Sequence, residues 1–299
     1  MTSDSTLSGV IVPIVTPVDA QDRVDEAAFR QQIDHLLQAG VHGLFVGGSA
    51  GEGPLLTTDQ WQRMMEIAFD QVGGKIPVLG GTADTSTARV LDRLRRLREI
   101  GYSYLVIMPT FYTPSRTVDE QLRLFEACYQ QAEGAQLVAY NLPSATGVEL
   151  KMETMSQLCE RGWVCAVKES SGNPDYFWNV LQIALQHEVT MLVGDETLIA
   201  SGLLAGGSGI VPVCANFEPK TFVEAFNAAR EGRSDDLQRL QARIMLIRER
   251  APKGGDCWIA GVKYAVSRLG IGDGRPVSPL QPLNDQQRQA IEDIMEKSS

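Results

Sequence analysis

Short apolar runs alternate with amphipathic segments along most of this chain, and this alternation restricts its fold more than any other feature. Eight apolar runs have the length and the glycine-containing boundaries of buried parallel strands. The predicted strands cover residues 9–15, 43–46, 76–79, 104–108, 137–140, 164–168, 190–193 and 209–213. Segments with a helical period lie between them, at residues 25–38, 58–72, 86–100, 118–131, 153–161 and 173–187. Eight strand–helix units in succession predict a (β/α)8 TIM barrel of the α/β class.

A doubly wound open sheet shares this alternation and is the competing architecture. Its glycine-rich dinucleotide turn is missing after the first predicted strand, which runs into Pro13-Ile14-Val15-Thr16-Pro17. The barrel is therefore favoured. Three further helices are predicted at residues 234–250, 257–269 and 284–296. We expect residues 1–232 to form the barrel and residues 233–299 to form a C-terminal helical region packed on it.

The composition excludes several classes of partner. A formal net charge of −10 and a pI near 4.9 argue against a surface for nucleic acid or anionic membrane. No signal-peptide pattern is visible, and no apolar stretch reaches the roughly 18 residues of a membrane span. The five cysteines show neither CxxC nor Cys/His ligand spacing, so we expect no zinc site and no disulfide framework. Cytoplasmic residence fits this pattern best.

One lysine has an unusual position. Lys168 ends the apolar run 163–167, and none of the other six lysines closes a predicted strand. At the end of a buried strand, desolvation would lower the pKa of the amine and make it a nucleophile toward a carbonyl carbon. The alternative is a lysine whose ammonium group reaches solvent and pairs with a carboxylate.

Catalytic groups of a barrel lie at the C-terminal ends of its strands. The three histidines fall in helical patterns or before a strand, so a metal site or a histidine base is disfavoured there. Proton transfer then falls to Tyr140 or Tyr112, which Ser49 could connect, although each tyrosine could equally be a packed aromatic. For Asp195 and Glu196, which follow the seventh predicted strand, we expect a role in capping a helix.

Three motifs in order carry a resemblance to a known family. GGSAGE at 47–52, YNLPSATG at 140–147 and AVKESSGN at 166–173 resemble the dihydrodipicolinate synthase/N-acetylneuraminate lyase family of class I aldolases. The resemblance spans nearly the whole chain. It implies a barrel with a helical C-terminal region, a homotetramer built as a dimer of dimers, a 2-keto acid substrate, and no metal or organic cofactor.

The resemblance also implies roles for individual residues. Lys168 matches the lysine that forms a Schiff base with pyruvate or another 2-keto acid, and Tyr140 matches the phenol that moves protons. Ser49 matches the hydroxyl residue beside that phenol, and Tyr112 matches the tyrosine that completes the relay across a subunit interface. The residues expected to bind the substrate are Gly48, Ser49, Ala50 and Val211.

Two departures from the family pattern bear on the substrate. Ala145 stands where dihydrodipicolinate synthases carry an arginine for the substrate carboxylate, and Ala50 replaces a second hydroxyl residue. This favours the branch of 2-keto-3-deoxy sugar acid aldolases and dehydratases. A 4-hydroxy-tetrahydrodipicolinate (dihydrodipicolinate) synthase, which condenses pyruvate with aspartate semialdehyde, remains the main alternative. A barrel that binds a 2-keto acid without turnover, and a flavin or phosphosugar barrel, are the others.

Overall fold

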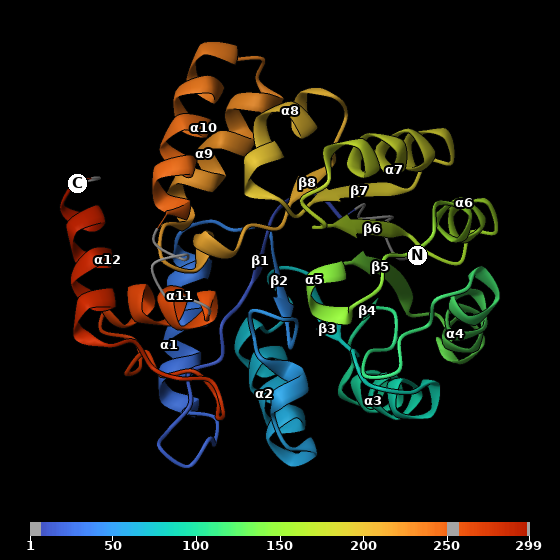
Figure 1. The fold of residues 1–299 in the computed structure, drawn as a ribbon, viewed down its shortest axis with the longest axis horizontal. Coiled ribbons are helices and arrows are strands. Elements are labelled where there is room, and N and C mark those ends of the chain that lie inside the picture. Colours follow the sequence, from blue (N-terminus) through green and yellow to red (C-terminus); the bar gives the residue numbers. More distant parts are fainter. Residues whose placement is uncertain (1–6, 250–256, 298–299) are drawn as a thin grey trace.

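The computed structural model describes residues 7–249 and 257–297, and in it eight parallel strands close into a barrel surrounded by helices (Figure 1). Each strand pairs with the next, and β8 returns to β1 with Gly9 opposite Gly209. The predicted TIM barrel is confirmed. The strands are β1 (Gly9–Pro13), β2 (Gly43–Val46), β3 (Val78–Gly81), β4 (Tyr104–Ile107), β5 (Gln136–Asn141), β6 (Ala166–Glu169), β7 (Thr190–Val193) and β8 (Gly209–Ile210).

Helices follow the strands and form the outer layer of the molecule. The helices up to the eighth unit are α1 (Glu26–Gln38), α2 (Thr58–Val72), α3 (Thr87–Ile100), α4 (Val118–Gln131), α5 (Pro143–Thr146), α6 (Met152–Glu160), α7 (Pro174–Gln186), α8 (Ile199–Leu204) and α9 (Pro219–Arg230). Short 3₁₀ helices are η1 (Gly53–Leu55), η2 (Glu196–Leu198) and η3 (Val213–Asn216). The short helices α5 and α8 were not among the predicted segments.

Side chains that cap helix N-termini explain where several of these helices begin. Asp25, Thr57, Ser86, Thr117 and Asn173 each accept a hydrogen bond from the backbone N–H three residues further on. Such a bond satisfies one of the four N–H groups that lack a partner within the helix. Three predicted helices started at the capping residue itself, one position before the observed helix.

The hydrophobic core has two layers, because successive residues of a barrel strand point to opposite sides. One layer lies inside the barrel and includes Ile11, Phe45, Val138 and Leu192. The larger layer lies between the strands and the surrounding helices. The interior of the barrel is therefore filled by side chains.

The predicted first and eighth strands are longer than the observed ones. After β8 the chain reaches Pro212, which has no N–H to donate, and then turns into η3. After β1, one asparagine occupies the backbone groups. The Asn216 side chain donates to Pro13 O at 2.9 Å and to Val213 O at 2.8 Å, and it accepts from Val15 N at 3.0 Å. Its amide thereby takes the place of a strand partner at the C-terminal end of β1. The third predicted strand is displaced as well, since β3 continues through Gly80 and Gly81, which the apolar pattern did not include.

Three helices follow the eighth unit: α10 (Ser234–Arg248), α11 (Trp258–Ser267) and α12 (Asp285–Lys297). The prediction of three helices is confirmed, while the last predicted residue of the first one, position 250, and Lys253 lie outside the described residues. Helix α10 packs against α9, and α11 contacts η3 and α12. In the described part of the chain, no helix combines the length and the apolar character that crossing a bilayer requires.

Candidate active site

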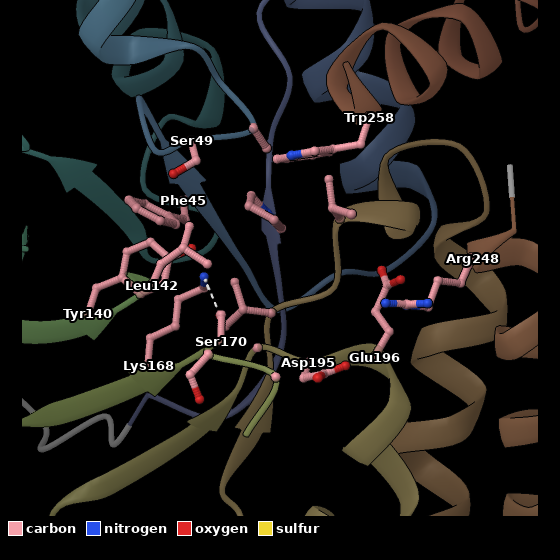
Figure 2. A pocket seen from close by; sticks show the side chains of 17 residues that line it. Phe45, Ser49, Tyr140, Leu142, Lys168, Ser170, Asp195, Glu196, Arg248 and Trp258 are labelled. Carbon is pink, nitrogen blue, oxygen red and sulfur yellow. Dashed lines mark hydrogen bonds between the residues drawn. The ribbon is translucent and has the colours of Figure 1, made fainter. Parts of the chain in front are cut away.

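A cavity of about 510 Å³ opens at the C-terminal end of the barrel strands (Figure 2). In a TIM barrel this is the end at which loops gather side chains from several strands, and at which active sites are found. The polar side chains around the cavity are Ser49, Tyr140, Lys168, Ser170, Ser171, Asp195, Glu196 and Arg248. Its apolar side chains are Pro13, Phe45, Ala50, Leu142, Val211, Val213 and Trp258.

Lys168 lies on β6 with its amine in this cavity, and only 5% of the residue is exposed. Its Nζ donates to Ser170 Oγ at 3.1 Å and lies 3.4 Å from the centre of the Tyr140 ring. It forms no ion pair with any residue that the structure describes. Burial lowers the pKa of this amine well below its ordinary value of 10.5. The lysine is therefore not the solvent-exposed, carboxylate-paired residue that the sequence left open.

Tyr140 lies beside Lys168 on the neighbouring strand β5, where the two residues are paired in register. The side chains of Ser170 and Ser49, which come from different elements, act on its phenol and tend to lower its pKa. Burial raises the pKa of the phenol, because the phenolate would lose its hydration. Tyr140 thus holds its proton and can share it with two hydroxyl groups close to the amine.

The loop after β2 carries Ser49 and Ala50 into the cavity wall. Its backbone turns at Gly47, whose φ of 70° lies in the left-handed region that glycine adopts without strain. At Gly48 an added Cβ would lie 2.6 Å from the ring of Phe45, so the loop passes directly over a residue of the cavity. Gly48 itself does not line the cavity, in contrast to Ser49, Ala50 and Val211.

Tyr112 does not reach the cavity of its own chain. It lies in the loop after β4, is 92% exposed and has a φ of 71°. In the single chain the structure therefore brings together Lys168, Tyr140 and Ser49 but not Tyr112. Its predicted role across a subunit interface stays a prediction.

The two acidic residues after β7 have different roles. Asp195 caps η2 by accepting from Thr197 N at 2.9 Å, as predicted. Glu196 was expected to do the same, and this is wrong: it is buried, lines the cavity and accepts from Cys214 N at 2.8 Å. Burial raises the pKa of Glu196, while the charge of Arg248 opposes that increase. Figure 2 shows the Arg248 side chain extending from α10 toward Glu196.

Sequence reasoning did not identify several residues of the cavity, among them Ser170, Arg248 and Trp258. Ser170 follows Lys168 by two positions, so the strand end itself could have indicated it. Arg248 and Trp258 come from α10 and α11, beyond the eight strand–helix units. No local pattern relates these helices to the strand ends, and only the tertiary fold brings them together.

This geometry defines the class of protein: a TIM barrel whose cavity holds a buried, unpaired lysine next to a protonated phenol. The chain belongs to the Dihydrodipicolinate synthetase family, whose model matches residues 6–298. It is accordingly an enzyme of the class I aldolase/lyase group.

Individual relatives agree with this membership. The chain is 32% identical over 289 residues to an uncharacterised DapA-like lyase of Halobacterium salinarum, covering 96% of this chain and 92% of that protein. It is 33% identical over 285 residues to the 4-hydroxy-tetrahydrodipicolinate synthase of Thermomicrobium roseum, covering 93% and 91%. A solved dihydrodipicolinate synthase from Bacteroides thetaiotaomicron has a TM-score of 0.90 and 29% identity, covering 97% of this chain and 98% of that one.

Proposed function

We propose that this enzyme forms a Schiff base between Lys168 and the keto carbon of pyruvate or a 2-keto-3-deoxy acid. The observation that carries the proposal is the Lys168 amine, which is buried in a cavity, forms no ion pair with a described residue and has a lowered pKa despite the charge of Glu169. A neutral amine attacks a carbonyl carbon, whereas an ammonium group cannot. No metal or organic cofactor is required for this step.

In the proposed reaction the amine adds to C2 of the keto acid, and the C2 oxygen leaves as water after gaining protons. The resulting iminium accepts an electron pair from the substrate. In an aldol cleavage the C3–C4 bond breaks, the C4 hydroxyl loses its proton, an aldehyde leaves and an enamine remains. Protonation of C3 and hydrolysis then release pyruvate and the free lysine. Tyr140, with the hydroxyls of Ser49 and Ser170, is positioned to carry these protons.

Dehydration of the same substrate begins from the same iminium. A proton leaves C3, and the C4 hydroxyl departs with a proton as water. In both reactions the phenol donates a proton when the C2 oxygen leaves, accepts one from the C4 hydroxyl or from C3, and then returns it to C3 or to the departing C4 hydroxyl, so the chain's residues support either. The carboxylate of the keto acid would bind the backbone N–H groups of Ser49 and Ala50, which line the cavity.

We propose the 2-keto-3-deoxy acid branch because Ala145 offers no charge to a second carboxylate. Ala145 is exposed on α5, and no arginine replaces it there. The runner-up is the synthase reaction with aspartate semialdehyde, which is supported by the likeness to the 4-hydroxy-tetrahydrodipicolinate synthase of Thermomicrobium roseum.

A turnover panel separates these reactions. The protein is incubated with 2-keto-3-deoxy sugar acids, and in parallel with pyruvate and aspartate semialdehyde, and products are resolved by chromatography and mass. We expect pyruvate release or loss of water from a sugar acid, and little synthase product unless Ala145→Arg is introduced. Strong synthase activity of the unmodified protein would overturn the branch assignment, and binding of keto acids without any turnover would favour a non-catalytic barrel.

A further inference from the structure

A buried ion pair connects the loop after β2 to the C-terminal helices. Lys263 Nζ and Glu52 Oε2 lie 2.6 Å apart although the residues are 211 positions apart in the sequence. The side chains are only 3% and 0% exposed. Burying two charges is costly unless good geometry and further hydrogen bonds compensate for the lost hydration. A pair this well enclosed therefore holds its two elements in one relative position.

On one side, the pair ends at the loop that carries Ser49 and Ala50. The backbone N–H of Glu52 donates to Ser49 O at 3.2 Å, which closes the turn between them. Glu52 has a φ of 54°, in the region that non-glycine residues rarely adopt. Thr16 Oγ1 donates to Gly51 O at 2.8 Å and holds the loop from the opposite side. The Glu52 side chain therefore anchors a strained turn directly behind the cavity wall.

On the other side, the pair ends at a helix that also contributes to the cavity. Lys263 belongs to α11, and Trp258 at the start of α11 lines the cavity. The second carboxylate oxygen, Glu52 Oε1, accepts from Val277 N at 2.7 Å. Both oxygens of Glu52 are thus held by the C-terminal region. One helix fixes the loop through Lys263 and forms part of the cavity wall through Trp258.

We propose that Glu52 and Lys263 are positioning residues, through which α11 sets the geometry of the Ser49–Ala50 loop for the keto-acid carboxylate. The proposal rests on the proposed function, because the loop binds that carboxylate only if a keto acid reacts at Lys168. The competing explanation is a pair that stabilises the fold and leaves substrate binding unaffected.

The test measures how the borohydride-trapped pyruvate adduct depends on pyruvate concentration. In Lys263→Met we expect the half-saturating concentration to rise about tenfold, since displacing a binding group by even 1 Å has large effects. We expect the rate of trapping at saturating pyruvate to change by less than about threefold, since Lys168 and Tyr140 are not touched. Glu52→Gln should show a smaller rise, because its amide oxygen still accepts from Val277 N.

A matched control separates positioning from loss of stability. Phe125 is fully buried on α4 and does not line the cavity, so Phe125→Leu lowers stability without altering the loop. The control should keep the half-saturating concentration of the unmodified protein. An unchanged value in folded Lys263→Met and Glu52→Gln, or an equal rise in Phe125→Leu, would overturn the proposal.

Hydrogen exchange decides the question independently of the chemistry. If Lys263→Met folds poorly, Glu52→Gln is used in its place. In the ion-pair variant, hydrogen exchange in a peptide covering residues 47–55 should be faster than in the same peptide of Phe125→Leu. Equal exchange in the two variants would overturn the proposal. If the unmodified protein forms no adduct, the proposed function fails, and faster exchange would still support anchoring of the loop by the pair.

Discussion

The surroundings of Lys168 disfavour the charged form of its amine. The residue is buried, its amine donates to the neutral hydroxyl of Ser170, and it is close to the rings of Tyr140 and Phe45. The aromatic faces and the charge of Glu169 favour a cation, but burial has the larger effect and lowers the pKa. Lys263 is buried to a similar degree but pairs with Glu52 at 2.6 Å, so its amine is not available as a nucleophile.

The burial of Lys168 predicts that its removal stabilises the protein. Lys168→Met should abolish adduct formation and raise the free energy of unfolding at pH 7 by about 1 kcal/mol, as for other destabilised active-site groups. A folded-state pKa below the unfolded value means that the unfolded chain binds more protons between the two values. The gain should therefore shrink as the pH rises toward 10.5. Thermal and urea unfolding at several pH values measure it; a less stable variant would contradict the burial argument.

The same lowered pKa predicts the pH dependence of the chemistry. The neutral amine reacts, so the rate of adduct formation should rise with pH and level off well below the ordinary lysine pKa of 10.5. Stopped-flow or quenched trapping with borohydride across a pH series gives this apparent pKa. A rate that keeps rising to pH 10.5 would show that Lys168 is an ordinary solvated lysine.

At this scale the sequence predicts the residues at strand ends and misses those that reach the cavity from elsewhere. Lys168 and Tyr140 terminate apolar strands, and a barrel brings such ends together. Arg248 has no counterpart in any local pattern, and Lys263 looked like an ordinary helical residue. Their positions depend on how the C-terminal helices pack, which the sequence pattern alone does not specify.

Among the elements, β3 ends in two glycines, Gly80 and Gly81, that lie close to other parts of the fold. Its two glycines face opposite sides. A Cβ on Gly81 would lie 2.5 Å from the backbone oxygen of Gly47, where the Ser49–Ala50 loop begins. A Cβ on Gly80 would instead meet the flexible end of Leu97 at 2.7 Å, between barrel and helices.

This difference predicts that Gly81→Ala and Gly80→Ala have distinct effects. Both should lower the free energy of unfolding by about 1–3 kcal/mol through overpacking. Gly81→Ala should also weaken pyruvate binding, since the rigid backbone of the loop must move. Gly80→Ala is the matched control and should retain the pyruvate affinity of the unmodified protein. Concentration dependence of adduct trapping measures this; equal affinities in the two variants would contradict the role given to β3.

The two glycines also explain why the sequence pattern predicted β3 at residues 76–79, two positions before the observed strand. An apolar pattern ends a strand at Leu79, because glycine is unfavourable in strands. The close approach of the Gly47 backbone demands glycine instead. Likewise, the first strand was predicted too long because the side chain of Asn216 bonds to the backbone of Pro13 and Val15. In both cases a tertiary contact overrides a local propensity, whereas the capped helices α2 and α4 were predicted with their observed bounds.

For the whole molecule, the exposed Tyr112 is the feature that one chain does not explain. It is 92% exposed in the loop after β4 and does not line the cavity. We propose that the protein is a homo-oligomer, a dimer of dimers, in which Tyr112 completes the proton relay of a neighbouring subunit.

This predicts that Tyr112→Phe lowers turnover and has little effect on the free energy of unfolding of the subunit. Sedimentation should show a species larger than a monomer, and activity per subunit should fall on dilution below the association range. The exposed Tyr129→Phe, which lies on α4, serves as the matched control and should remain active. A fully active monomer, or full activity of Tyr112→Phe, would contradict the proposal.

The most direct test of the account is the mass of the protein after incubation with pyruvate and borohydride, followed by peptide mapping. We predict one reduced pyruvyl adduct per chain, located on Lys168 and absent from Lys168→Met. An adduct on another lysine, or no adduct in folded protein under conditions that label a known Schiff-base aldolase, would contradict the central claim.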